Sequence, residues 1–275
     1  MVKPIWFLRA LSVITFSLCL SLPHLFAETT GAGEVHYAIS AAELKNSLAE
    51  VQELISQGEL LEAKSRYQTL LQYDLGVEDR NSVRQSLEDL NLKILFSPIL
   101  TPDSLHYTVR EGDSLYKIAE RHHTTIDLIK KSNHLQGDLI RPGMELKVSK
   151  AVYSILIRKS ENKLILYSDE EPLKTYPVAT GEGVRTPIGT FTIESKLENP
   201  VWFRAGAVLP AGSPENILGT RWLGFSLAGY GIHGTTDPDT IGQHVTQGCV
   251  RMRNEAVEEL YSIVPLKTKA TIVEA

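Results

Sequence analysis

A cysteine and a histidine near the C-terminal end of this 275-residue sequence have side chains that can do covalent chemistry. Cys249 can act as a nucleophile once a base removes its proton, and His233 is a candidate for that base. An imidazolium at His233 would lower the pKa of the thiol by ion pairing, and Arg251 supplies a fixed cation nearby. Gly248 lacks a Cβ, so backbone N–H groups beside it can approach and stabilise an oxyanion. These residues predict a cysteine nucleophile that attacks a carbonyl carbon.

The order of these residues resembles the signature of the YkuD-type L,D-transpeptidases, cysteine enzymes that cross-link or trim bacterial peptidoglycan. That signature is a His–Gly pair, a variable loop and then Ser/Thr-x-Gly-Cys-(Ile/Val)-Arg. This sequence has the pair at His233-Gly234 and the second part at Thr246 through Arg251. Residues 186–191, Thr-Pro-Ile-Gly-Thr-Phe, match the TPxGxF segment of the family. The resemblance covers residues 152–273 and identifies the chain as an L,D-transpeptidase.

The resemblance implies a cysteine acyl-enzyme mechanism without a cofactor or metal. Cys249 would attack the third residue of a stem tetrapeptide and release D-alanine, and a neighbouring stem amine would then complete a 3→3 cross-link. Water as the acceptor would instead make the chain an L,D-carboxypeptidase. The family would use the carbonyl of Gly234 to fix the His233 tautomer, Gly248 in the oxyanion hole, and Arg251 and Thr246 around the substrate.

Several residues have competing interpretations. Many family members carry a second histidine before the Gly–Cys pair, and this chain has Gln247 there, so a catalytically retired wall-binding protein is an alternative. His244 is another candidate for the base. Asp237 and Asp239 flank a proline and predict a turn. Three aromatic residues could line a substrate groove or be buried: Trp202, Trp222 and Phe225. The sequence has no HxxEH or paired CxxC zinc pattern, which argues against a metallopeptidase.

A second motif occupies residues 106–149. Its pattern predicts a β-α-α-β unit, with Ser114 and the Thr124/Asp127 pair as helix caps. The residues YTVREGDSLYKIAERH and IRPGMELKV resemble a LysM domain. In that family two loops bind glycans that contain N-acetylglucosamine, and the matching residues here are Gly112, Asp113, Ser114, Leu115, Ile140 and Arg141. A tethered glycan-binding module would raise the local concentration of the enzyme at its polymeric substrate. His122 and His123 are interpreted as surface residues.

Residues 1–27 predict an export signal, with Lys3 and Arg9 before a short apolar run and Ala27 at a possible cleavage point. Retention as an N-terminal anchor is the alternative. Cleavage would remove Cys19 and leave Cys249 without a disulfide partner in an oxidising compartment. We therefore expect an exported protein of the periplasm or cell wall, with no transmembrane span after cleavage. The net charge of −5 offers no basic stripe for nucleic acid, so the expected partner is peptidoglycan.

The predicted fold is multidomain α+β. Residues 28–97 have the apolar spacing of helices and predict a helical spacer that is weakly tetratricopeptide-like, followed by a linker at 98–105. The LysM-like βααβ domain at 106–149 precedes a mostly-β catalytic domain at 151–275. Strands are expected at residues 153–157, 163–167, 175–180, 191–193 and 270–273, and one helix at 254–263. We expect a sandwich or barrel-like arrangement of these strands, and Pro177 suits an edge strand.

Overall fold

The computed structural model describes residues 37–204 and 206–274, so the expected export signal lies outside the described residues. The described chain begins with three helices: α1 (Ala41–Gln57), α2 (Leu60–Leu70) and α3 (Val77–Leu95). A reciprocal capping box of Ser40 and Glu43 starts α1, and Gly58, at φ 84°, ends it in the left-handed conformation that glycine adopts without strain. Short parallel strands β1 (Tyr37–Ala38) and β2 (Tyr73–Asp74) pair beside the helices.

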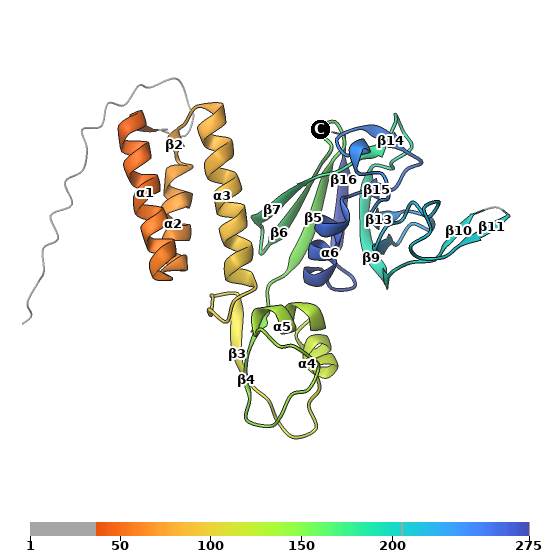
Figure 1. The fold of residues 1–275 in the computed structure, drawn as a ribbon, viewed down its shortest axis with the longest axis horizontal. Helices are drawn as coiled ribbons and strands as arrows, with labels where there is room; N and C mark the ends of the chain where they lie inside the picture. Colours follow the sequence, from red (N-terminus) through yellow and green to blue (C-terminus); the bar gives the residue numbers. More distant parts are fainter. Residues whose placement is uncertain (1–36, 205, 275) are drawn as a thin grey trace, which may run out of the picture.

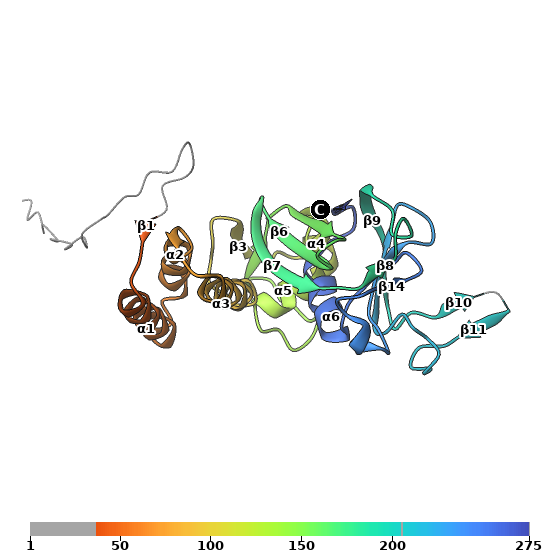
Figure 2. The same cartoon turned by 90° about the horizontal axis from the view of Figure 1, so that it is seen from above.

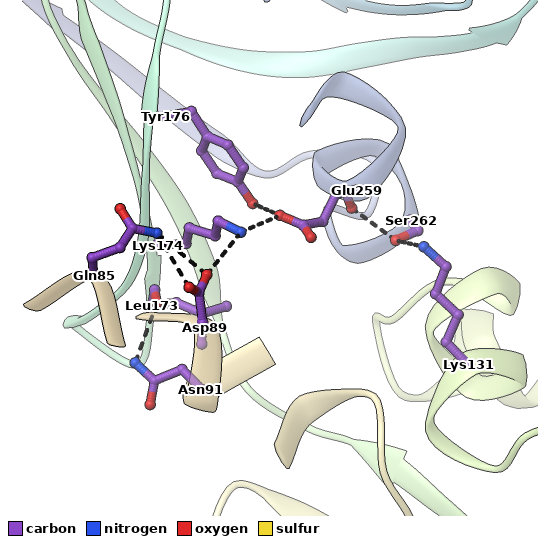
Figure 3. A network of polar contacts seen from close by, with 9 residues as sticks. All are labelled: Gln85, Asp89, Asn91, Lys131, Leu173, Lys174, Tyr176, Glu259 and Ser262. Atoms are coloured by element: carbon purple, nitrogen blue, oxygen red, sulfur yellow. Dashed lines mark hydrogen bonds and ion pairs between the residues drawn. The ribbon is translucent and has the colours of Figure 1, made fainter. Parts of the chain in front are cut away.

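The three helices pack on one another through their own apolar cluster. The buried members include Leu44, Val51, Ala63, Tyr67, Val83, Leu90 and Ile94. Helix α3 also lies along strand β7 (Glu171–Pro177), as Figures 1 and 2 show. Ion pairs stabilise this junction (Figure 3). Nζ of Lys174 in β7 lies 3.7 Å from Oδ1 of Asp89 in α3 and 3.2 Å from Oε1 of Glu259. Side-chain contacts therefore fix α3 against strand β7 of the sheet.

Residues 104–149 form the β-α-α-β unit. Its elements are β3 (Ser104–Thr108), α4 (Leu115–Arg121), α5 (Ile126–Ser132) and β4 (Glu145–Ser149). Strands β3 and β4 pair antiparallel, and β3 begins inside the segment that was expected to be a linker. Ser114 caps α4 as predicted, but the cap of α5 is Thr125, whose side chain accepts the N–H of Leu128 at 2.9 Å. The predicted Thr124 cap is therefore wrong by one residue, and the buried Thr124 hydroxyl has no hydrogen-bond partner among the described residues.

This unit contacts the end of α3 and also helix α6 (Asn254–Ile263), below which it lies in Figure 1. The sequence predicts a linker at 98–105 before the unit and none of these contacts. Lys147 of β4 is only 4% exposed, and its Nζ donates to the carbonyl oxygens of Ile94 (2.8 Å), Leu95 (3.3 Å) and Ser97 (2.9 Å) at the end of α3. Lys131 of α5 donates to the Ser262 hydroxyl of α6 at 2.8 Å (Figure 3). The Lys147 ammonium group lies at the C-terminal end of α3, where a cation also interacts favourably with the helix dipole.

Residues 153–273 contain an eight-stranded mixed sheet in the order β15-β13-β12-β9-β16-β5-β6-β7. The strands are β5 (Tyr153–Arg158), β6 (Lys163–Ser168), β7, β9 (Gly189–Glu198), β12 (Arg221–Phe225), β13 (Gly231–His233), β15 (Val250–Arg251) and β16 (Lys269–Val273). The long strand β9 pairs with β16 through its first residues and with β12 through its last, so it joins two halves of the sheet. Pro177 lies on the edge strand β7, as expected.

Helix α6 packs between the two halves of the sheet, as Figures 1 and 2 show. Its buried residues Val257, Leu260 and Ile263 join one core with Ile155 of β5 and Ile232 of β13. The smaller elements are β8 (Thr180–Gly181), β10 (Trp202–Arg204), β11 (Ala207–Leu209), the 3-10 helix η1 (Pro238–Thr240) and β14 (His244–Thr246). Among the helices of the described residues, none combines the length and apolar character needed to cross a bilayer.

Candidate active site

The predicted nucleophile and base lie beside two short strands that run parallel. Strand β13 ends at His233, and β15 follows directly after Cys249; in the pairing of these strands, His233 lies opposite Arg251. Residues directly opposite each other on paired strands face the same side of the sheet, so Arg251 shares a face with His233. All three line one cavity of about 720 Å³. The structure therefore brings together residues that lie sixteen positions apart in the sequence.

Cys249 carries a free thiol that is partly exposed in this cavity. Its Sγ lies 3.6 Å from the carbonyl oxygen of Gly229, to which the thiol donates. Burial raises the pKa of the Cys249 thiol and outweighs the N–H of Gly231 and the cation of Arg251, which both lower it. The expectation that an imidazolium at His233 lowers this pKa is therefore wrong for the resting site, where burial keeps the sulfur protonated.

His233 is 2% exposed, and its ring has one defined partner. Nδ1 lies 2.6 Å from the carbonyl oxygen of Gly234. A carbonyl oxygen can only accept, so Nδ1 carries the proton and Nε2 keeps its lone pair. Burial lowers the pKa of His233 to about 4, so the ring is neutral near pH 7. The ring also stacks on Trp222, with 6.0 Å between centroids and 17° between planes. The imidazole is thus held as a neutral base.

Gly248 is the residue whose backbone the turn before Cys249 requires. Its φ of 130° lies in a region that residues with a Cβ rarely adopt. A Cβ here would also lie 2.6 Å from both the carbonyl oxygen of Arg185 and the ring of Tyr230. Arg185 directly precedes the Thr-Pro-Ile-Gly-Thr-Phe segment, so the start of that segment lies against the turn that carries Cys249. Strain and crowding both favour glycine at this position.

Thr246 closes the same turn with its buried hydroxyl. The hydroxyl donates to the carbonyl oxygen of Cys249 at 2.6 Å and accepts the N–H of Gly248 at 3.2 Å. The Gly248 N–H is therefore already occupied, which corrects its assignment as an oxyanion donor. Thr246 shapes the loop and also lines the cavity.

Arg251 is 9% exposed and lines the cavity with part of its guanidinium unpaired. Nη1 donates to the Thr240 hydroxyl at 2.8 Å, whereas the buried Nε has no hydrogen-bond partner among the described residues. Burial lowers the pKa of Arg251, and the nearby Asp237 carboxylate opposes that shift. A buried cation with an open donor suits an anionic substrate group.

The competing candidates lie elsewhere. His244 binds Thr180 Oγ1 at 2.8 Å and Asn162 Nδ2 at 3.2 Å through its two ring nitrogens. Asp237 and Asp239 belong to the exposed turn around η1, as expected. Trp202 and Trp222 line the cavity, but Phe225 is buried against Phe191, with 5.6 Å between ring centroids. In the described part of the chain, no three His, Cys, Asp or Glu side chains gather closely enough to hold a metal ion.

Sequence reasoning missed two residues of the cavity wall. Tyr230 packs against Gly248 and lines the cavity, and the hairpin of β10 and β11 contributes Phe203 beside Trp202, which the sequence already suggested as a groove residue. Phe203 is 74% exposed, so this hairpin presents an apolar surface beside the opening. Its three-residue strands are too short to give an alternating pattern, and the tyrosine carries no spacing signal.

The predicted glycan-binding residues divide by exposure. Gly112 and Arg141 are exposed, and Ile140 is half-buried. Asp113 is occupied within its own loop, where it accepts the Tyr107 hydroxyl at 2.7 Å and the Arg110 N–H at 2.9 Å; these bonds lower the pKa of Asp113, the Arg110 N–H most of all. Ser114 caps α4, and Leu115 is 3% exposed in the core of the unit, so its side chain is not free to contact a sugar.

His122 is half-buried, with its ring edge-on to Tyr107 at 5.6 Å between centroids, whereas His123 is exposed. Burial lowers the pKa of His122, and the cation of Arg121 adds to that shift. The expectation of two surface histidines therefore holds for His123 alone.

Comparison with known families assigns both modules. Residues 152–272 match the L,D-transpeptidase catalytic domain (YkuD), and residues 107–149 match the LysM domain. The L,D-transpeptidase YkuD of Bacillus subtilis is 36% identical over 176 residues, which cover 61% of this chain and 98% of that protein. YqjB of the same organism is 36% identical over 126 residues, covering 44% of this chain and 70% of that protein.

A solved L,D-transpeptidase of Mycobacterium smegmatis aligns with 48% of this chain and 63% of its own, at 20% identity and a TM-score of 0.38. The two Bacillus relatives extend over most of their own lengths, and both matched domains agree with the residues that the sequence singled out. The chain therefore belongs to the L,D-transpeptidase family and carries a LysM domain.

Proposed function

We propose that the chain is an exported peptidoglycan L,D-transpeptidase that forms 3→3 cross-links between stem peptides. The observation that carries the proposal is the placement of Cys249 and of a neutral imidazole at His233, fixed by the Gly234 carbonyl, on the wall of one cavity. A volume of about 720 Å³ lies within the range of small-molecule sites. It suits a peptide end rather than a folded protein.

Acylation begins with the thiol protonated and the imidazole neutral. As Sγ attacks the carbonyl carbon of the L-centre of the third stem residue, Nε2 of His233 takes the thiol proton. The backbone N–H of Cys249 is our candidate donor to the oxyanion, because the N–H of Gly248 is engaged by Thr246. The C–N bond then breaks, His233 returns the proton to the departing amine, and D-alanine leaves. The product is a thioester on Cys249.

The second half-reaction resolves this thioester. An amine of a neighbouring stem gives its proton to Nε2, attacks the thioester carbon and displaces the sulfur as a thiol. Water in the same place would release a tripeptide and make the chain an L,D-carboxypeptidase. The exposed hairpin with Phe203 beside the opening favours transfer, because apolar walls shield the thioester from water. Arg251 is suited to attract the stem carboxylate, because this cation lines the cavity.

The remaining modules bring this chemistry to the wall. We infer that the LysM domain at 106–149 binds the glycan through the backbone of Gly112 and the side chains of Ile140 and Arg141. Residues 1–27 would direct export to the periplasm or cell wall, 28–97 would form a helical spacer, and 151–275 would be the catalytic domain. We propose that the protein acts in cell wall organisation and cell shape and has no nucleic acid partner.

A product assay with the purified chain and disaccharide-tetrapeptide tests the proposal. Mass spectrometry should show loss of D-alanine together with a cross-linked dimer. Loss of D-alanine without a dimer would identify a carboxypeptidase. An unchanged substrate would favour the third possibility, a retired wall-binding protein, for which the exposed Gln247 at the position of a frequent family histidine is the motive.

A further inference from the structure

The peptide group between Gly234 and Thr235 is held at both of its ends. Its carbonyl oxygen accepts from His233 Nδ1 at 2.6 Å, and its N–H donates to Asn254 Oδ1 at 3.0 Å. Asn254 also donates through Nδ2 to the carbonyl oxygen of Thr235 at 2.9 Å and accepts the N–H of Thr220 at 3.3 Å. An unbroken chain of hydrogen bonds therefore runs from the imidazole through one peptide group to this asparagine.

The planarity of the peptide makes the two ends dependent on each other. In a trans peptide the C=O and N–H point in opposite directions and cannot rotate separately. Fixing the Thr235 N–H on Asn254 therefore aims the Gly234 carbonyl at His233. Hydrogen bonds in series also polarise one another, so the asparagine strengthens the acceptor that keeps the proton on Nδ1. Nε2 then keeps its lone pair, and the ring is fixed on the wall of the cavity that Cys249 also lines.

The surrounding chain makes room for this side chain and fixes its position. A Cβ on Gly219 or Gly234 would lie 2.2 Å from Asn254 Oδ1, so both glycines allow the close approach. Gly219 also has a φ of 63°, which suits glycine. Asn254 is the first residue of α6, whose buried residues are anchored in the main core. The asparagine is thus held by a rigid element.

We propose that Asn254 is a positioning residue for the catalytic base: it sets the tautomer and direction of His233 through the Gly234–Thr235 peptide. In papain-like proteases an asparagine completes the Cys–His pair as a third member. Here a peptide group is interposed between the ring and the amide. The kinetic part of this inference rests on the proposed function, whereas the tautomer part rests only on the hydrogen bonds.

The test compares Asn254→Ala with Asn133→Ala. Asn133 is a matched control, because it is also half-buried and also makes three hydrogen bonds to backbone: to the carbonyls of Ile129 and Lys147 and from the Lys147 N–H. It lies in the LysM unit, away from the cavity. With soluble disaccharide-tetrapeptide, Asn254→Ala should lower kcat by about 10- to 100-fold, the scale of a misplaced catalytic group. Its KM should stay within about twofold, and Asn133→Ala should leave both constants near wild type.

Two further measurements separate positioning from simple loss of stability. Nitrogen-15 NMR of the His233 ring should show a single Nδ1-protonated tautomer in the wild type and a mixture in Asn254→Ala. Asn254→Asp keeps the acceptor for the Thr235 N–H and should recover most of the tautomer preference and part of kcat. The midpoint temperatures of thermal unfolding should fall by similar amounts in Asn254→Ala and Asn133→Ala.

An unchanged tautomer and kcat in Asn254→Ala would overturn the inference, as would an equal loss of kcat in Asn133→Ala. If the wild-type chain proved inactive in every product assay, the proposed function would fall. The ring NMR would still decide whether Asn254 positions His233, because it needs no substrate.

Discussion

Two regions of the molecule use polar residues in opposite ways: the cysteine corner, formed by His233, Thr246, Cys249 and Arg251, and the LysM edge, formed by the exposed loops that carry Gly112 and Arg141. At the corner, His233, Thr246 and Arg251 are all buried, and their hydrogen bonds go to other parts of the same site. At the LysM edge, Gly112 and Arg141 are exposed. Buried polar groups are costly to leave unpaired, whereas exposed ones are compensated by water. Substitutions should therefore have large effects at the corner and small, local effects at the edge.

The largest expected effect is at the sulfur itself. Cys249→Ala should reduce turnover of disaccharide-tetrapeptide by at least about 10³-fold, since removal of a nucleophile abolishes the covalent route. Intact mass spectrometry should find a carbapenem adduct on the wild type and none on the variant. Peptidoglycan pull-down should be unchanged, because the LysM unit is intact. A variant that keeps turnover, or a wild type that stays unmodified by carbapenem, would contradict Cys249 as nucleophile.

Gly248→Ala tests how tightly the corner is built. The methyl group meets the Arg185 carbonyl and the Tyr230 ring at 2.6 Å, in a backbone conformation that itself disfavours alanine. We expect about a 100-fold loss of kcat and a fall of roughly 2–4 kcal/mol in the free energy of unfolding. Gly242→Ala is the control, because Gly242 has a φ of 91° with nothing within 4 Å of the added carbon. Equal losses in the free energy of unfolding for Gly248→Ala and Gly242→Ala would show that the added carbon at Gly248 is not crowded.

The buried imidazole makes the corner sensitive to acid. The unfolded chain binds a proton at His233 below about pH 6.5, whereas the folded chain does so only below about 4. Between these values the unfolded state binds more protons, so stability is complete above pH 6.5 and is lost as the pH falls toward 4. The loss should reach roughly 3 kcal/mol. Urea unfolding at several pH values should show a shallower acid loss for His233→Gln than for wild type.

His244→Gln provides the control for that experiment, since this ring is exposed. It should follow the wild-type acid profile. If His233→Gln and wild type lost stability in parallel between pH 6.5 and 4, the buried neutral imidazole would not be the cause.

The smallest effect belongs to the LysM edge. Arg141→Ala should weaken peptidoglycan pull-down by about two- to fivefold, because an exposed contact contributes about 1 kcal/mol or less. Turnover of a soluble disaccharide-tetrapeptide and the unfolding midpoint should remain at wild-type values. Lys150→Ala, an exposed cation at the end of the same unit, should leave pull-down unchanged. An equal loss of pull-down in Arg141→Ala and Lys150→Ala would indicate that the LysM edge binds only through nonspecific charge.

Long patterned elements could be predicted from the sequence, whereas the elements that build the corner could not. Alternation located β5, β6 and β16, and apolar spacing located α6 with the bounds that the structure has. Strands β13 and β15 have only three and two residues, and their parallel pairing depends on contacts between distant segments. The sequence motif named Cys249 and His233 but not their charge states, because those follow from burial.

Asn254 illustrates the same limit at one residue. In the sequence it is only a polar residue at the start of a helix, since its three backbone partners come from segments 19 and 34 positions away. The placement of the LysM unit was also not predictable. A lysine in a strand pattern is expected at the surface, and Lys147 is instead buried against the end of α3.

That lysine has a consequence for the geometry of cell-wall recognition. Its ammonium group donates to three carbonyl oxygens at the end of α3, so side-chain contacts as well as the chain attach the LysM unit to the rest of the protein. Under the proposed function, this attachment restricts the distance between the thiol and a glycan bound by the LysM loops. We then expect the shape of the protein to select which stem peptide, counted along that glycan, reaches the cavity.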